Sequence, residues 1–139
     1  MIKRGVQILL AVFFLAAGVL HFQLDDAFAR IVPPMLPFPV AIVWITGAME
    51  LAFAAALIAK WRLPLTGLLL SAYLLAVLPA NIYMALAQIP LGDTALSPAA
   101  LWIRVALQFP LIALVLWSTG APPFRKAPDT DGQAPPPQP

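Results

Sequence analysis

Four long runs of apolar residues, separated by short polar or Pro-rich segments, constrain this chain more than any other feature. They cover residues 5–24, 40–59, 65–87 and 97–117, and the first has no permanently charged side chain. About 20 consecutive apolar residues let a helix cross a hydrocarbon core of ~30 Å. Because only helices and closed barrels satisfy their backbone polar groups in lipid, we expect an all-α fold, a bundle of four transmembrane helices.

The composition agrees with a lipid environment and excludes several classes of function. Of the 139 residues, 62% are hydrophobic and only 10% are charged, which is unusual for a soluble domain. The net charge is +2, and the basic residues stand singly or in pairs between the apolar runs, so we expect no nucleic-acid partner. No cysteine and one histidine are present, so disulfides, thiol chemistry and multi-histidine metal sites are excluded within one chain.

The chain divides into a transmembrane domain, residues 1–120, and a Pro-rich polar tail, residues 121–139, that we expect to be disordered. The lipid bilayer is the expected partner, and the expected location is a cell membrane, as a multi-pass protein of the bacterial inner membrane. A signal peptide is the weaker interpretation of the N-terminus, because the first apolar run exceeds the usual ~7–15 residues. Both termini are predicted to be cytoplasmic, since one side of a four-span arrangement holds six basic residues: Lys3, Arg4, Lys60, Arg62, Arg125 and Lys126.

The connection between the first and second spans has two parts. Asp25 and Asp26 are suited to the start of a short helix at the membrane surface. Four prolines between residues 33 and 39 each fix φ, so we expect a stiff, extended outer loop there.

Two features of the spans predict how the helices pack. Alanines at every fourth position, Ala48, Ala52 and Ala56, form a small-residue stripe that would let a neighbouring helix approach closely. Pro79 should kink the third span and free the carbonyl of Leu75, with an amide at position 81 available to satisfy it.

Polar residues are rare inside the spans, and their depths place them together. Glu50 lies about 15 Å into the second span, and a lone carboxylate there costs several kcal/mol unless it is paired, so we treat it as a site. Arg104, on the fourth span, is the expected partner of Glu50. We expect a pocket, open to the outer face, that contains a polar residue from every helix: His21, Thr46, Glu50, Asn81, Arg104 and Gln108.

Each of these residues also has a structural interpretation. Glu50 and Arg104 would then form an ion pair that fixes helix register, and His21 would bond a backbone carbonyl near the interface. Asn81 would repair the helix broken by the nearby proline, while Thr46 and Gln108 would make interhelical hydrogen bonds. No nucleophile, metal-ligand set or phosphate-binding loop accompanies them, so we predict no catalytic residue.

Several segments together resemble the DoxX family of small bacterial membrane proteins. The specific parts are IVPPMLP at residues 31–37 and PANIYM at residues 79–84; GVLHF at 18–22, GAME at 47–50 and the Arg104–Gln108 pair are weaker. The resemblance extends from about His21 to Trp117. It implies a Pro between Arg104 and Gln108 where this chain has Ala106, so we expect a straighter fourth helix.

The resemblance implies a four-helix membrane bundle associated with redox proteins. The leading hypothesis is therefore an accessory or anchor subunit of a redox-associated membrane complex, whose polar pocket takes a quinone or another small molecule. No cofactor is required by the sequence, and a redox enzyme, another membrane subunit or a second copy of the chain are the candidate partners. The alternative hypothesis is a small transporter or proton-conducting component with Glu50 as the titrating site.

Overall fold

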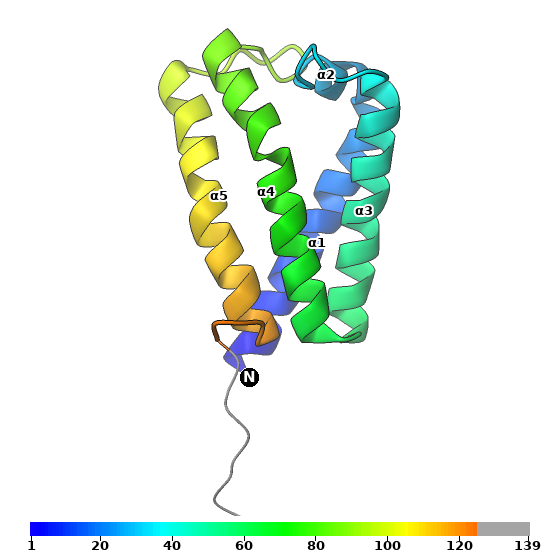
Figure 1. Cartoon of the computed structure of the whole chain (residues 1–139), viewed down its shortest axis with the longest axis vertical. Coiled ribbons are helices and arrows are strands. Elements are labelled where there is room, and N and C mark those ends of the chain that lie inside the picture. The colour runs from blue at the N-terminus through cyan, green and yellow to red at the C-terminus, as the bar shows by residue number, and fades with distance from the viewer. Residues whose placement is uncertain (125–139) are drawn as a thin grey trace, which may run out of the picture.

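The computed structural model describes residues 1–124 and is all-helical (Figure 1). Each of the four long helices is long and apolar enough to cross a membrane. The predicted all-α fold, with four helices able to span a membrane, is therefore confirmed. Most of the predicted disordered tail lies outside the described residues. The helices, in chain order, are α1 (Ile2–Gln23), α2 (Asp25–Ala29), α3 (Pro39–Ala59), α4 (Leu63–Ala87) and α5 (Pro98–Thr119).

The boundaries of α5 follow from local chemistry. Ser97 caps its N-terminus, with Oγ accepting a hydrogen bond from the backbone N–H of Ala100 at 3.2 Å, and Pro98 occupies the first turn. At the other end Gly120 adopts the left-handed conformation, with φ of 69°, that commonly terminates a helix.

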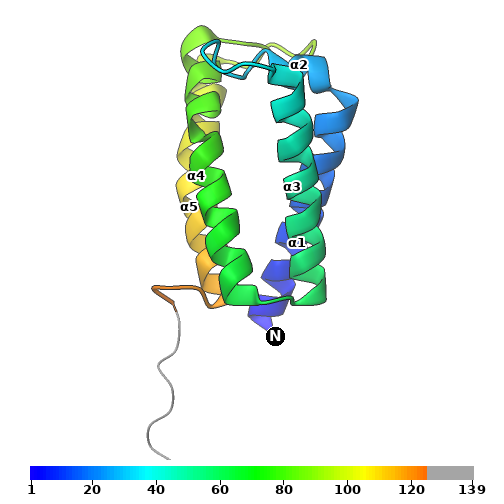
Figure 2. The same ribbon diagram turned by 45° about the vertical axis from the view of Figure 1, so that its right-hand side comes forward.

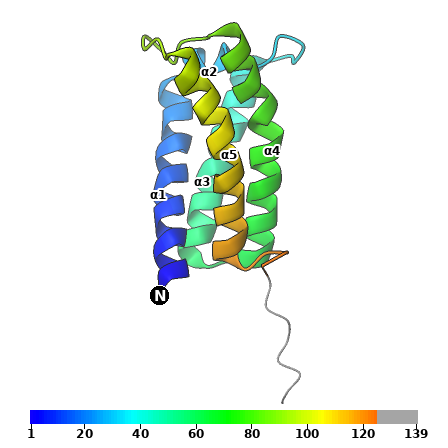
Figure 3. The same cartoon turned by 90° about the vertical axis from the view of Figure 1, so that its left-hand side faces the viewer.

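The four long helices form two pairs. Helix α1 packs along α3, and α4 packs along α5, whereas α3 and α5 have no Cα atoms within 8 Å of each other in residues 1–124. Figure 2 shows the two pairs side by side, joined at one end by the loops around α2 and at the other by the α3–α4 turn. The N-terminus and the end of α5 lie at the same end of the bundle (Figure 3).

Two glycines allow α1 and α3 to pack closely. A Cβ atom added to Gly18 would lie 2.9 Å from the carbonyl oxygen of Gly47, and one added to Gly47 would lie 2.7 Å from Cβ of His21. The predicted stripe of Ala48, Ala52 and Ala56 does not form this contact, because Ala48 and Ala52 are exposed and Ala56 is only half-buried. Helix α3 turns the face with Gly47 toward α1, because a residue without a side chain permits the closest approach of two helix backbones.

Apolar side chains close the bundle at its N-terminal end. The buried cluster there includes Phe14 of α1, Leu57 of α3, Leu70 of α4 and Val115 of α5, so every long helix contributes. A second buried cluster, which includes Met84, lies toward the end that holds α2. The cavity-lining polar residues described below are distinct from the polar residues buried at the N-terminal end, such as Gln7 and Ser118.

The Pro-rich loop between α2 and α3 consists of turns. The backbone N–H of Leu36 donates to the carbonyl of Pro33 at 2.9 Å, and Pro34 occupies the second position of that turn. The predicted extended connection is therefore wrong. The fixed φ of proline, near −65°, suits this turn position as well as it suits an extended chain.

Gly18→Ala should destabilise the bundle by about 1–3 kcal/mol, because the new methyl group would meet the backbone of α3. Gly5→Ala, in the same helix, is the matched control, since an added Cβ there meets nothing within 4 Å. Thermal unfolding of the two detergent-solubilised variants should show a lower midpoint for Gly18→Ala alone. Equal midpoints would contradict the close contact.

Candidate functional site

A cavity of about 1280 Å³ lies between the two helix pairs. Its walls come from all four long helices, and the segment from α2 through the Pro-rich loop covers one end. Most of the lining is apolar. The cavity brings together all six predicted site residues and one more, Tyr73; that they bind a ligand stays a prediction. The polar members are His21, Thr46, Glu50, Tyr73, Asn81, Arg104 and Gln108.

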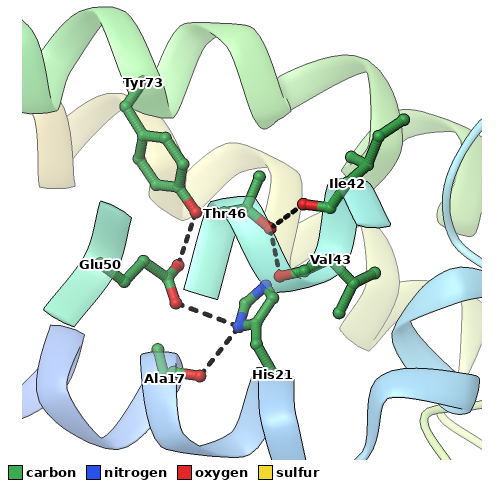
Figure 4. Close-up of polar contacts among 7 residues, drawn as sticks. All are labelled: Ala17, His21, Ile42, Val43, Thr46, Glu50 and Tyr73. Carbon is green, nitrogen blue, oxygen red and sulfur yellow. Dashed lines mark hydrogen bonds and ion pairs between the residues drawn. The ribbon is translucent and has the colours of Figure 1, made fainter. Parts of the chain in front are cut away.

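Glu50 is held by side chains from two other helices, α1 and α4 (Figure 4). The residue is only 7% exposed. Its Oε1 accepts a hydrogen bond of 2.8 Å from the hydroxyl of Tyr73, and its Oε2 lies 3.0 Å from Nδ1 of His21. The intramembrane carboxylate thus has two polar neighbours inside the protein, as its burial requires.

The position of His21 defines which ring nitrogen carries a proton. Nδ1 lies 2.8 Å from the carbonyl oxygen of Ala17 and 3.0 Å from Oε2 of Glu50 (Figure 4). Both neighbours are acceptors, so Nδ1 must be the protonated nitrogen of a neutral ring, or one of two in the imidazolium. Oε2 makes no hydrogen bond with residues 1–124, and its contact with Nδ1 of His21 is an ion pair when the ring is the imidazolium. Phe28 of α2 stacks on the ring at 4.3 Å.

Thr46 lies one turn before Glu50 on α3 and lines the same cavity. Its hydroxyl points back to its own helix, within 3.0 Å of the carbonyl of Ile42 and 2.9 Å of that of Val43. Serine and threonine commonly make this bond inside helices. The Thr46 hydroxyl therefore donates within α3, and the expected interhelical hydrogen bond stays a prediction.

A second polar cluster connects α5 to α4. Nε of Arg104 donates to Oδ1 of Asn81 at 3.2 Å, and Nδ2 of Asn81 donates to Oε1 of Gln108 at 2.8 Å. Gln108, which is 5% exposed, in turn donates through Nε2 to the carbonyl of Leu74. These bonds run in one direction, from the guanidinium to the α4 backbone, and fix the three side chains relative to one another.

The side-chain hydrogen bonds near Pro79 of α4 differ from the prediction. Asn81 was expected to satisfy the carbonyl freed by Pro79, yet its side chain bonds to α5. Gln108 reaches the α4 backbone from the neighbouring helix, but at the carbonyl of Leu74, one residue before the carbonyl that Pro79 frees. The prediction of a straighter fourth helix also left out Pro110. This proline lacks the N–H that would bond the carbonyl of Ala106.

The predicted ion pair between Glu50 and Arg104 is wrong. In residues 1–124 no contact within 4.0 Å joins the two groups, and the one such pair in the cavity is His21–Glu50. The reason is the helix pairing: α3 and α5 stand on opposite sides of the cavity, so each charge finds partners on a nearer helix.

Tyr73 is the member of the site that sequence reasoning missed. This tyrosine was not among the predicted site residues, although a hydroxyl within an apolar run needs a partner. The missed signal is its place ten residues into α4, which is near the depth of Glu50. Tyrosine and histidine together give the carboxylate one hydrogen bond and one ion pair.

The chemistry of the two clusters differs. Tyr73, Glu50 and His21 form a linked set that can hold or exchange a proton, whereas Arg104 only donates hydrogen bonds. No group of three or more His, Cys, Asp or Glu side chains comes together as a metal site among the described residues. The arrangement therefore offers proton handling on one side of the cavity and a fixed positive charge on the other.

Residues 10–119 match the family described as a domain of unknown function, DUF8561. The chain belongs to this family. The DUF8561 match begins in α1 and ends at the last residue of α5, so it coincides with the helix bundle and its cavity. No curated protein matches the chain. Nor does any solved structure.

Tyr73→Phe should lower the free energy of unfolding by about 1–3 kcal/mol, because it removes the hydrogen bond to a buried carboxylate. Tyr83→Phe is the control, since that hydroxyl has no hydrogen bond with residues 1–124, and it should change stability by less than about 0.5 kcal/mol. Denaturant unfolding in mixed micelles measures both. Equal losses would show that the bond to Glu50 contributes nothing specific.

Proposed function

We propose that this DUF8561 protein is an accessory or anchor subunit of a membrane complex, and that its cavity binds an amphipathic small molecule. The observation that carries the proposal is the cavity of about 1280 Å³, with apolar walls and two polar clusters. Pockets for drug-sized ligands measure about 300–1,000 Å³, so this volume accommodates a polar head and part of an apolar tail. A quinone is the candidate that the resemblance to the DoxX family adds.

The cavity is placed to receive its ligand from the bilayer. The α2 segment covers one end and the apolar cluster around Phe14 closes the other. Three apolar side chains that line the cavity are also exposed: Met49 of α3, Leu69 of α4 and Ile103 of α5. In a membrane these exposed positions face acyl chains, which favours lateral entry of an amphipath.

The membrane orientation is part of the same proposal. Arg4 donates to the carbonyls of Leu57 and Ile58, at 2.8 Å each, so the basic N-terminus lies beside the basic α3–α4 turn. This concentration of positive charge at one end supports cytoplasmic termini in a bacterial inner membrane. The α2 end and its Pro-rich loop would then face the outer side. A redox enzyme is the partner that the DoxX resemblance suggests.

A cavity-filling substitution tests ligand binding. Ala76 lines the cavity and is exposed, so Ala76→Phe adds bulk there without entering the buried core. Protein purified from native membranes should carry an amphipath at close to one per chain, and Ala76→Phe should lower that occupancy at least several-fold. Ala48→Phe, at an exposed position outside the cavity, is the matched control. Mass spectrometry of the extracted lipids measures the occupancy. An empty wild-type protein, or equal occupancy in the Ala76→Phe and Ala48→Phe variants, would contradict the proposal.

Proton movement through Glu50 is the second candidate function. The observation that favours it is the contact of Glu50 with both Tyr73 and His21 inside the spans. The apolar cluster at the N-terminal end opposes a continuous path. Liposomes with wild-type protein should then show a pH-driven flux that Glu50→Gln abolishes while the unfolding midpoint stays close to that of wild type. A wild-type flux equal to that of empty liposomes would exclude this candidate.

A further inference from the structure

The guanidinium group of Arg104 has hydrogen-bonding capacity that the protein leaves unused. Of its five N–H groups, only the one on Nε has a partner among residues 1–124, the Oδ1 atom of Asn81. Arg104 lines the cavity and is partly exposed to it. The two terminal nitrogens are therefore available to a ligand within the cavity.

Among residues 1–124, the positive charge of Arg104 also has no direct counter-ion. Glu50, the one carboxylate that lines the cavity, is engaged by Tyr73 and His21 and makes no contact within 4.0 Å with Arg104. A cation in an apolar environment is costly when unpaired, and intramembrane charges pair or mark a ligand pathway. The cavity therefore contains a carboxylate with two protein partners within 3.0 Å and a guanidinium with no carboxylate of residues 1–124 within 4.0 Å.

The surroundings of Arg104 hold it in a fixed position. Asn81 and Gln108 extend the hydrogen-bond chain from Nε to the backbone of α4, so the planar group is anchored on one edge. A guanidinium anchored in this way presents its terminal nitrogens as a fork, which matches two oxygens of a carboxylate or phosphate. Preorganisation of this kind reduces the entropy lost on binding.

We propose that Arg104 binds the head group of an anionic amphipath, a carboxylate or phosphate oxyanion, whose acyl tail lies along the apolar cavity wall. This inference rests on the proposed function and names its ligand class. The exposed apolar rim at Met49, Leu69 and Ile103 supplies the route for such a molecule from the bilayer. A fatty acid and a lysophospholipid share this chemistry, and the experiment separates them.

The test compares ligands that share one tail and differ in the head group. Binding of oleate, 1-oleoyl-lysophosphatidic acid and neutral oleyl alcohol to the full chain in a non-ionic detergent is measured by equilibrium dialysis. Oleate or the phosphate should bind at least 10-fold more tightly than the alcohol, and the tighter of the two identifies the oxyanion. Because this comparison uses the wild-type protein, it does not depend on whether any variant folds.

Substitutions at Arg104 assign the effect to the side chain. Arg104→Gln should remove most of the preference for the anionic ligand, while Arg104→Lys, which keeps the charge without the fork, should retain part of it. Arg30→Gln removes an exposed arginine outside the cavity and should change nothing. A preference that survives in Arg104→Gln would overturn the assignment.

The remaining outcomes separate this inference from the proposed function. If oleyl alcohol or decylubiquinone binds as tightly as the anions, the cavity binds amphipaths but Arg104 is not an anion site. Both the inference and the proposed function fail if no ligand binds more tightly to wild-type protein than to Ala76→Phe. The ligands compared are oleate, 1-oleoyl-lysophosphatidic acid, oleyl alcohol and decylubiquinone.

Discussion

A carboxylate at mid-membrane depth has to be satisfied by the protein itself, and the arrangement of this bundle depends on how Glu50 is satisfied. Water is scarce at that depth, so its two oxygens need neighbours from adjacent helices. Tyr73 reaches Glu50 from α4, and His21 reaches it from α1. The carboxylate thereby connects the two helix pairs at one height, although α3 itself packs mainly on α1.

The close contact between Gly18 and Gly47 explains why the charges are divided. It draws α1 against α3 and places His21 beside Glu50. Helices α4 and α5 form the other pair, and Arg104 turns to Asn81 within that pair. Each charged group therefore has a partner within its own pair, and Tyr73 is a further partner of Glu50 from the other pair. A cavity separates this carboxylate, which has protein partners, from a guanidinium with donors left over.

Much of the architecture could be predicted because span length, charge and helix caps are local properties of a sequence. The rise per residue gives the depth of each polar side chain, so the six cavity residues could be gathered at one level. Depth does not give the direction in which a side chain points around the bundle. The predicted ion pair between Glu50 and Arg104 was wrong for this reason, since it required α3 and α5 to be neighbours.

Other features depend on contacts between segments far apart in the chain. The helix pairing is decided by glycines in α1 and α3 whose complementarity is a property of both surfaces together. Tyr73 resembled ordinary core until a carboxylate was found beside it. The Pro-rich loop allowed both turns and extended chain, and contacts with the remainder of the protein select between them.

Photo-labelling with a fatty acid that carries a diazirine in its acyl chain tests the central claim, that amphipaths enter the cavity between the helix pairs. Labelled residues are mapped by peptide mass spectrometry after irradiation of the protein in lipid nanodiscs. The account predicts adducts on cavity-lining side chains such as Phe53 and Val77, reduced by excess unlabelled fatty acid. Adducts confined to exposed residues outside the cavity, such as Ile45, Ile58 and Leu75, would contradict it.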